Sequence, residues 1–248
     1  MVRGLLIRGM LAGLLAAVLA FGVARIIGEP EVDLAIAFEE QVAMAAGDAH
    51  DHEEEELVSR AIQASIGLFT GVGVYGVAFG GLFALAFAFL YGRIGRVGPR
   101  VAAALLAGAG FVAIVIVPSL KYPPNPPATG DPDTIGYRTA LYFTMIAVGI
   151  VAMVVAELLR RRLVMRLGAW SGALLAAAAF VVMIVVAQQL LPSINEIPEA
   201  FPADVLWRFR IASLGVQLVL WATIGLGFGA LAERLLGSQY RYAAPLLR

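Results

Sequence analysis

Six long stretches of this sequence contain no Asp, Glu, Lys, Arg or His, and they limit the fold more than any other feature. A helix needs about 20 apolar residues to cross roughly 30 Å of hydrocarbon, and most of the stretches reach or approach that length. Hydrophobic residues make up 60% of the 248 residues and charged residues 15%, a composition typical of membrane proteins. The sequence therefore predicts an all-α integral membrane protein, a six-helix transmembrane bundle that forms one domain over 1–248. The uncharged stretches are 9–24, 61–92, 101–120, 139–156, 167–195 and 211–232.

The charges that flank these stretches set the expected helix bounds. The first helix reaches full length because Arg8 and Arg25 can extend their charged ends to the two membrane interfaces. A cleaved signal peptide is the alternative for this segment, but Arg25-Ile26-Ile27 is a poor small-residue cleavage site, so we expect the helix to be retained. The expected helices are about 4–27, 64–91, 99–119, 138–159, 167–190 and 207–232.

Basic and acidic residues are distributed unequally between the two sides of these helices. The N-terminus, the turns 92–100 and 159–166 and the C-terminal tail hold 12 of the 18 Lys and Arg residues. The three alternate loops hold 16 of the 18 Asp and Glu residues. The positive-inside rule therefore predicts that both termini lie in the cytoplasm. The equal totals of basic and acidic residues give no argument for nucleic acid as a partner.

The three segments expected outside the cell differ in character. The longest, 28–62, has a weakly amphipathic stretch after Pro30, which predicts either an interfacial helix on the outer leaflet or an irregular loop. The other two, 119–137 and 192–207, are rich in proline, which fixes its own backbone angle and restricts the residue before it. We expect these two loops to be stiff, and the sequence does not indicate a role for 122–133.

The hairpins 101–159 and 169–235 resemble each other. Each leaves the membrane at a Pro-Ser-aliphatic step, continues into a proline-rich loop and returns with an Asp shortly before an aromatic–Arg pair. One interpretation is a parallel hairpin repeat of the kind from which some transporters are built. The other is that any two capped hairpins look alike.

Glycines cluster in two of the expected helices. The stretch Gly71-Val72-Gly73-Val74-Tyr75-Gly76 matches the dinucleotide-binding fingerprint letter for letter, but it lies inside a spanning helix instead of between a strand and a helix. We therefore interpret it, with Gly67 and Gly80, as a small-residue face that lets another helix pack closely. The same interpretation applies to Gly225, Gly227 and Gly229 near the end of the chain.

The expected membrane interior offers little chemistry. The polar residues at that depth are uncharged, which disfavours a buried carboxylate relay or a charged metal site within the bundle. The chain has no cysteine, no Gly-x-Ser-x-Gly elbow, no His-Glu-x-x-His motif and no Walker loop. We therefore do not expect an enzyme. The interior polar residues are Gln63, Thr70, Thr144, Gln188, Gln189, Gln217 and Thr223.

Metal-binding side chains are concentrated in one acidic stretch of the first outer loop. The segment 48–56 contains six carboxylates and both histidines of the protein. In a flexible loop, two imidazoles separated by one residue can converge on one divalent first-row metal ion. The alternative is a solvated acidic run. The candidate metal ligands are His50, His52, Asp48, Asp51, Glu53 and Glu54.

Charged residues at the ends of the expected helices predict local ion pairs. On the outer side, Asp133 is expected to pair with Arg138, and Asp204 with Arg208 or Arg210. Arg and aromatic residues at this level normally anchor helices at the membrane interface. The alternative function for these residues is that the two loops form the entrance of a conducting path. On the inner side, Glu157 and Glu233 are each expected to pair with arginines near them.

The sequence resembles the CbtA family, predicted cobalt transporter subunits of bacterial membranes. The resemblance rests on Gly28-Glu29-Pro30-Glu31, on Ala37-Phe38-Glu39-Glu40, on the His50-Asp51-His52 stretch and on the proline loop from Lys121 to Asp133. It implies a multi-pass protein of the bacterial inner membrane that takes up cobalt. It also implies a partner, a small one-helix subunit (CbtB) that carries histidines, and a link to cobalamin supply.

We therefore expect a membrane subunit for the uptake of a divalent metal cation, with cobalt as the favoured metal. The protein is expected to bind no cofactor tightly and to transport Co²⁺. The outer loop would gather the ion, more weakly below about pH 6 as histidine protonates, and a partner subunit would complete the path. The lipid bilayer is the expected environment, and an oligomer is compatible with the sequence. The alternatives are a non-transporting membrane scaffold whose acidic loop binds a partner protein and, less favoured, a lipid-modifying enzyme.

Overall fold

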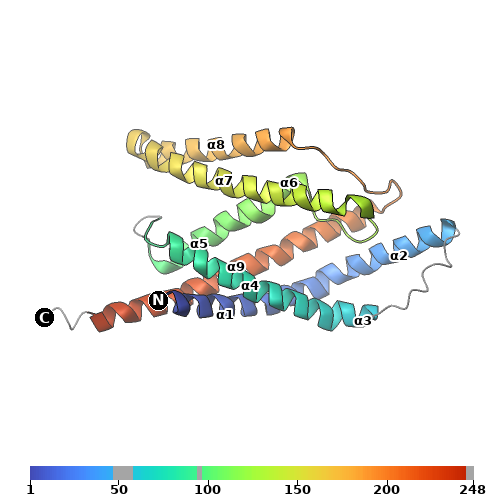
Figure 1. Cartoon of the computed structure of the whole chain (residues 1–248), viewed down its shortest axis with the longest axis horizontal. Coiled ribbons are helices and arrows are strands. Elements are labelled where there is room, and N and C mark those ends of the chain that lie inside the picture. The colour runs from blue at the N-terminus through green and yellow to red at the C-terminus, as the bar shows by residue number, and fades with distance from the viewer. Residues whose placement is uncertain (47–57, 94–96, 244–248) are drawn as a thin grey trace. The chain divides into compact units, whose positions relative to one another are not determined.

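The computed structural model describes residues 1–46, 58–93 and 97–243, and within these it contains helices and no strand. Six of the described helical segments are long and apolar enough to cross a membrane (Figure 1). The predicted all-α fold class with six spans is therefore confirmed. The six segments are Val2–Ala45, Arg60–Leu90, Pro99–Lys121, Pro132–Leu167, Ala169–Leu190 and Ala203–Gly237.

Three of these spans contain a wider π-helical turn between two α-helical parts. The first is α1 (Val2–Val23), η1 (Ala24–Gly28) and α2 (Glu29–Ala46). The second is α3 (Arg60–Ile62), η2 (Gln63–Gly67) and α4 (Leu68–Leu90), and the third is α5 (Pro99–Gly110), η3 (Phe111–Ile116) and α6 (Val117–Lys121). A short 3₁₀ turn η4 (Pro132–Thr134) precedes α7 (Ile135–Leu167), which is followed by α8 (Ala169–Leu190) and α9 (Ala203–Ala243).

The first helix differs from its expected bounds. The helix that begins at Val2 continues past residue 27, where the sequence predicts the start of a loop, and ends at Ala46. The π turn at Ala24–Gly28 takes the place of a break. Residues 29–46 are therefore helical, and their position relative to a membrane surface stays a prediction.

The chain forms two compact units, which we describe separately. Unit 1 consists of Met1–Gly108, Pro126–Ala128 and Ala203–Arg248, and unit 2 of Ala109–Asn125 and Thr129–Pro202. Since α8 and α9 belong to different units, the structure does not test the predicted hairpin repeat.

Small residues join α1 to α4 in unit 1. A Cβ added at Gly13 would clash with the carbonyl oxygen of Gly76, and one added at Gly80 would clash with the carbonyl oxygen of Gly9. Backbones approach this closely only where side chains are absent. The packing role predicted for Gly76 and Gly80 is therefore confirmed, whereas a Cβ at Gly71 would meet nothing within 4 Å.

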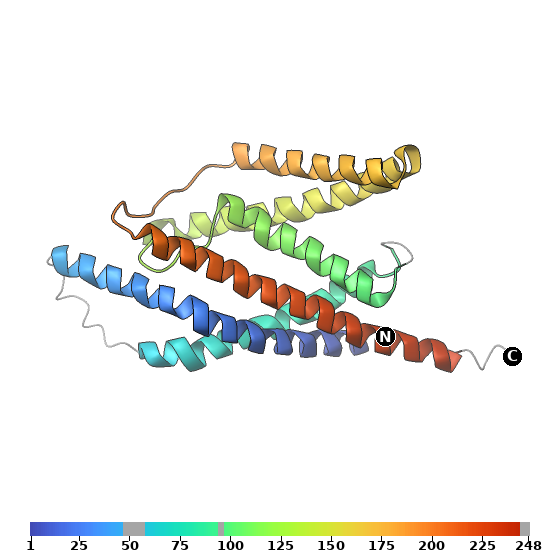
Figure 2. The same cartoon turned by 180° about the vertical axis from the view of Figure 1, so that it is seen from behind.

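Helix α9 packs along α1 and α5 through different faces. Gly4 faces Leu235 and Gly227 faces Ala12, so α1 and α9 are antiparallel (Figure 2). A Cβ at Gly225 would lie 2.5 Å from the Cβ of Ala107. The predicted role of the glycines near the end of the chain in close helix packing is therefore confirmed for Gly225, where α9 meets α5.

Unit 2 is built on the antiparallel pair α7 and α8. The two helices are joined at Gly168, whose φ of 82° suits glycine and ends α7. Their core contains Val117, Met145 and Ile184, with partly buried side chains around them. This packing places the loops that precede α7 and follow α8 at the same end of unit 2.

Candidate functional site

The predicted metal ligands His50, His52, Asp48, Asp51, Glu53 and Glu54 lie outside the described residues. The description stops at Ala46, the end of α2, and resumes at Val58, just before α3. Among the described residues, no group of three or more His, Asp or Glu side chains is placed to hold a metal ion. The loop site therefore stays a prediction. The described charged residues that are nearest to it in the sequence lie on α2 and at the start of α3.

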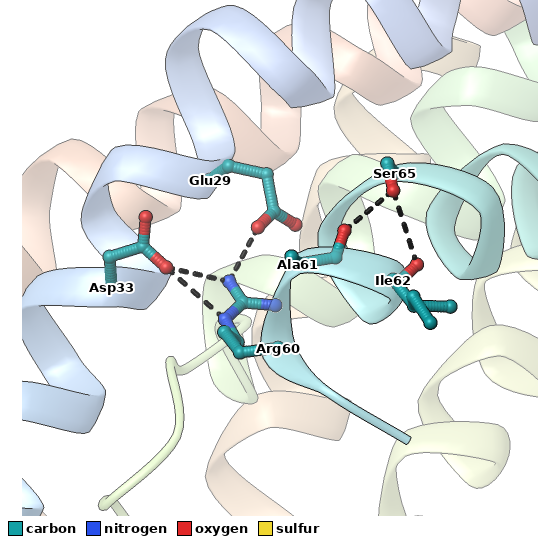
Figure 3. A network of polar contacts seen from close by, with 6 residues as sticks. All are labelled: Glu29, Asp33, Arg60, Ala61, Ile62 and Ser65. Atoms are coloured by element: carbon teal, nitrogen blue, oxygen red, sulfur yellow. Dashed lines mark hydrogen bonds and ion pairs between the residues drawn. The ribbon is translucent and has the colours of Figure 1, made fainter.

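Arg60, the first residue of α3, binds two carboxylates of α2 (Figure 3). Its Nη2 lies 2.5 Å from Glu29 Oε2 and 3.0 Å from Asp33 Oδ1, and its Nε donates to the same Asp33 oxygen at 3.2 Å. Glu29 and Asp33 are four residues apart and so share one face of the helix. The Glu29 side chain is 8% exposed, whereas that of Asp33 is 58% exposed.

The two π turns lie at the same level beside this cluster. The rings of Phe21 and Phe69 meet edge to face at 5.3 Å, and Glu29 meets Arg60 further along, so the antiparallel helices bring η1 and η2 opposite each other. A π turn widens the helix and disturbs its hydrogen bonds. The hydroxyl of Ser65 in η2 donates to the carbonyl of Ala61 at 2.5 Å, which supplies a partner for one backbone oxygen there (Figure 3).

A second buried carboxylate of α2 pairs with α9. Arg208 Nε lies 3.1 Å from Glu31 Oε1, and Arg208 Nη2 lies 3.1 Å from Asp204 Oδ2. The predicted pairing of Asp204 with Arg208 is therefore confirmed. The Glu31 side chain is 11% exposed. Because Glu29 and Glu31 point to different faces of α2, they connect this helix to α3 and to α9, respectively.

The sequence does not predict that Glu29 and Glu31 are buried and paired. Charges end the apolar stretch before them, so the expectation for this segment is either an interfacial helix or an irregular loop, and the partners Arg60 and Arg208 are distant in sequence. A signal was available, since two acidic residues around a proline directly after a spanning segment are costly at that depth unless paired. Arginine supplies the fixed fork of donors that such a pair needs.

In unit 2, Glu196 connects the two proline-rich loops. Its Oε2 accepts hydrogen bonds from the Asp131 amide and the Thr134 hydroxyl, each at 2.9 Å, and lies 3.3 Å from Arg138 Nε. Arg138 also donates to the Asp131 carbonyl oxygen at 3.0 Å. The predicted pairing of Arg138 with Asp133 is therefore wrong: Arg138 pairs with Glu196, because the Asp131 amide and the Thr134 hydroxyl hold that carboxylate beside it.

Two further hydrogen bonds connect the same loops. Lys121 Nζ donates to the Ser193 hydroxyl at 3.0 Å, and the Tyr122 hydroxyl donates to the Pro192 carbonyl oxygen at 2.8 Å. Burial raises the pKa of Tyr122, and Tyr137 raises it further, so the phenol keeps the proton that this bond uses. Residues 121–122 and 131–134 are thus held against the loop that follows α8.

The ion pairs predicted for the other helix ends are present. Glu157 of α7 binds Arg160 at 2.6 Å and Arg161 at 2.9 Å. In unit 1, Glu233 of α9 binds Arg100 of α5 at 2.6 Å. Pairs as exposed as these contribute little to stability.

Comparison with known proteins gives one match. No curated protein and no solved structure matches the chain. The sequence model of the CbtA family, described as a probable cobalt transporter subunit, matches residues 2–233. With six helices long and apolar enough to span a membrane, the chain is a multi-pass membrane protein, and it belongs to the CbtA family of probable cobalt transporter subunits.

Proposed function

We propose that this protein is the membrane subunit through which a bacterial cell takes up cobalt across its inner membrane. The observation that carries the proposal is the family match over residues 2–233, in a chain with six segments able to span a membrane. The same match supports a partner, because the family is described as a subunit. A small one-helix protein that carries histidines would supply the imidazole ligands that this chain lacks inside its spans.

The charges of unit 1 support an orientation with both termini inside. The end that contains the start of α1 and the start of α5 carries Arg3, Arg93 and Arg100, and α9 adds Arg234 there. The opposite end carries the carboxylates of α2 and Asp204. Basic residues gather on the cytoplasmic side of membrane proteins, which favours the exterior for the α2 end of unit 1.

The loop between α2 and α3 would collect the ion at that exterior end. Neutral imidazoles of His50 and His52 and nearby carboxylates are suitable ligands for Co²⁺, and metal binding requires them to be deprotonated.

Accumulation does not require an ATP site in this chain. The membrane potential contributes about 2.3 kcal/mol per charge per 100 mV, so a divalent cation gains about 4.6 kcal/mol on entering a cell at that potential. The absence of a Walker loop from the sequence is compatible with this source of energy. We propose transport and not catalysis, since the sequence carries no catalytic motif that we recognise.

The loop can be tested separately from the rest. His50→Ala/His52→Ala should lower ⁵⁷Co accumulation at limiting cobalt and leave it nearly unchanged at saturating cobalt, because the loop is proposed to capture the ion. Glu39→Gln/Glu40→Gln, which removes two exposed charges from α2, is the matched control. Unchanged uptake in the histidine variant at limiting cobalt would exclude the loop from capture of the ion.

A further inference from the structure

Two polar side-chain atoms near the middle of α9 are buried and have no hydrogen-bond partner among the described residues. They are Oε1 of Gln217 and Nε1 of Trp221. Both residues lie close to the midpoint of the span Ala203–Gly237, and Trp221 is 4% exposed. Buried polar groups nearly always have partners, and in a membrane interior the cost of leaving them without one is several kcal/mol. These two atoms therefore need an explanation.

The two residues belong to a polar stripe on one face of α9. Gln217 and Trp221 are four residues apart, and Ser213 precedes Gln217 by the same spacing, so the three side chains follow one another along the helix. Arg210 lies on this face one turn earlier. The stripe thus runs from the neighbourhood of Arg208, at the α2 end of unit 1, to the middle of the span.

Aromatic rings of α4 and α9 end the stripe. Phe79 packs edge to face on Trp221 at 4.8 Å between ring centroids. Further along the same face of α9, Phe228 contacts Phe83 at 5.5 Å and Phe87 at 5.0 Å, and it is fully buried. Closely packed aromatic rings of this kind offer no hydrogen-bond partner to a polar group. The polar residues of this face therefore lie on the α2 side of these ring contacts.

We infer that a water molecule binds between Gln217 and Trp221, and that this hydrated position is the inner end of a polar path along α9. The atoms select the ligand. The Gln217 oxygen needs a donor and the Trp221 N–H needs an acceptor, so a bare cation or an anion could satisfy only one of them. Water is both donor and acceptor, and polar side chains four residues apart on a helix are close enough for one molecule to bridge.

Water can bind at this position whether or not the protein carries cobalt. Its link to uptake, in which the hydration shell of a cation would supply this water, rests on the proposed function. If cobalt uptake fails and the water is found, the path stands without its proposed cargo. If the water is absent and uptake occurs, the ion takes another route.

The absence of cysteine from the sequence makes the position accessible to thiol chemistry. Single cysteines are placed in the full-length protein in nanodiscs, where a membrane-impermeant methanethiosulfonate carrying a trimethylammonium group reaches both faces. Only the thiolate reacts with this reagent. Desolvation raises the pKa of a thiol by a unit or more, so a cysteine at a dry position should react at least about tenfold more slowly than one in contact with water. Size-exclusion profiles check that each variant is folded.

Gln217→Cys is expected to react at least about tenfold faster than Leu218→Cys, its neighbour on the exposed, lipid-facing surface of the same helix. Ser213→Cys, a nearly isosteric change on the stripe, should also react fast and serves if Gln217→Cys does not fold. Ile224→Cys, buried beyond Trp221, should react as slowly as the lipid-facing control. Equal rates at 217 or 213 and at 218 would overturn the inference, and a fast reaction at 224 would contradict the proposed end of the path.

Discussion

Glu31 and Arg208 lie 177 residues apart in the sequence, and their side chains form an ion pair of 3.1 Å between α2 and α9. The pair continues the antiparallel register in which Gly4 faces Leu235 and Ala12 faces Gly227. The long first helix and α9 therefore run side by side past the point where the apolar stretch of the first helix ends. Glu31 is nearly buried because it has this partner.

Removal of Arg208 should destabilise the protein more than removal of the pair. In Arg208→Gln the Glu31 carboxylate stays nearly buried without its cation, and we expect a loss of about 1–3 kcal/mol, reduced because Arg208 is itself half exposed. The double variant Glu31→Gln/Arg208→Gln should recover part of it. Thermal unfolding in detergent measures both, with the exposed Arg234→Gln as control on the same helix. A double variant no more stable than Arg208→Gln would contradict this role for Glu31.

The glycine contact between α1 and α4 predicts a difference between two similar substitutions. Gly80→Ala would force its methyl group against the backbone of Gly9 and should cost about 1–3 kcal/mol. Gly71→Ala on the same helix meets open space and should be neutral or stabilising by up to about 1 kcal/mol. Unfolding midpoints of the two variants give the order. Equal midpoints would show that the close approach contributes nothing.

Arg60 should be what keeps divalent cations away from Glu29 and Asp33. In Arg60→Gln, two carboxylates on one helix face lose their cation, so the protein should be less stable at low salt and Ca²⁺ should restore part of the loss. Ca²⁺ favours oxygen ligands over imidazole, which limits the contribution of His50 and His52. The measurement is the unfolding midpoint with and without millimolar Ca²⁺. An equal calcium effect on the unaltered protein would refute the explanation.

Glu196 should control the order of the proline-rich loop. Without its carboxylate, as in Glu196→Ala, the Asp131 amide loses its acceptor and Arg138 its partner, so amide hydrogen exchange in 129–134 should be faster by about tenfold, the equivalent of about 1.4 kcal/mol. Glu199→Ala is the matched control, because Glu199 is exposed and lies in the same loop after α8 as Glu196. Exchange that is the same in both variants would mean that the loop is held by other contacts.

The sequence was sufficient for the spans because transmembrane helices must satisfy every backbone group internally, and uncharged stretches of the required length are a strong signal. The same rule ended the first helix near residue 27 and left the following segment as either an interfacial helix or a loop, since Glu29 and Glu31 are too polar for a packed helix unless cations such as Arg60 and Arg208 lie beside them. Nearness in sequence also misled the pairing of Arg138. Asp133 is closer along the chain, but the Asp131 amide and the Thr134 hydroxyl hold Glu196 beside that arginine. Such partners depend on tertiary packing, which one sequence does not display.

The proposed role in cobalt uptake is tested most directly by ⁵⁷Co accumulation in cells that express this chain with its neighbouring gene products, compared with cells carrying an empty vector. The account predicts accumulation above the vector control that saturates with cobalt and falls when valinomycin and potassium collapse the membrane potential. Accumulation equal to the vector control, with the protein present and folded in the membrane, would contradict it.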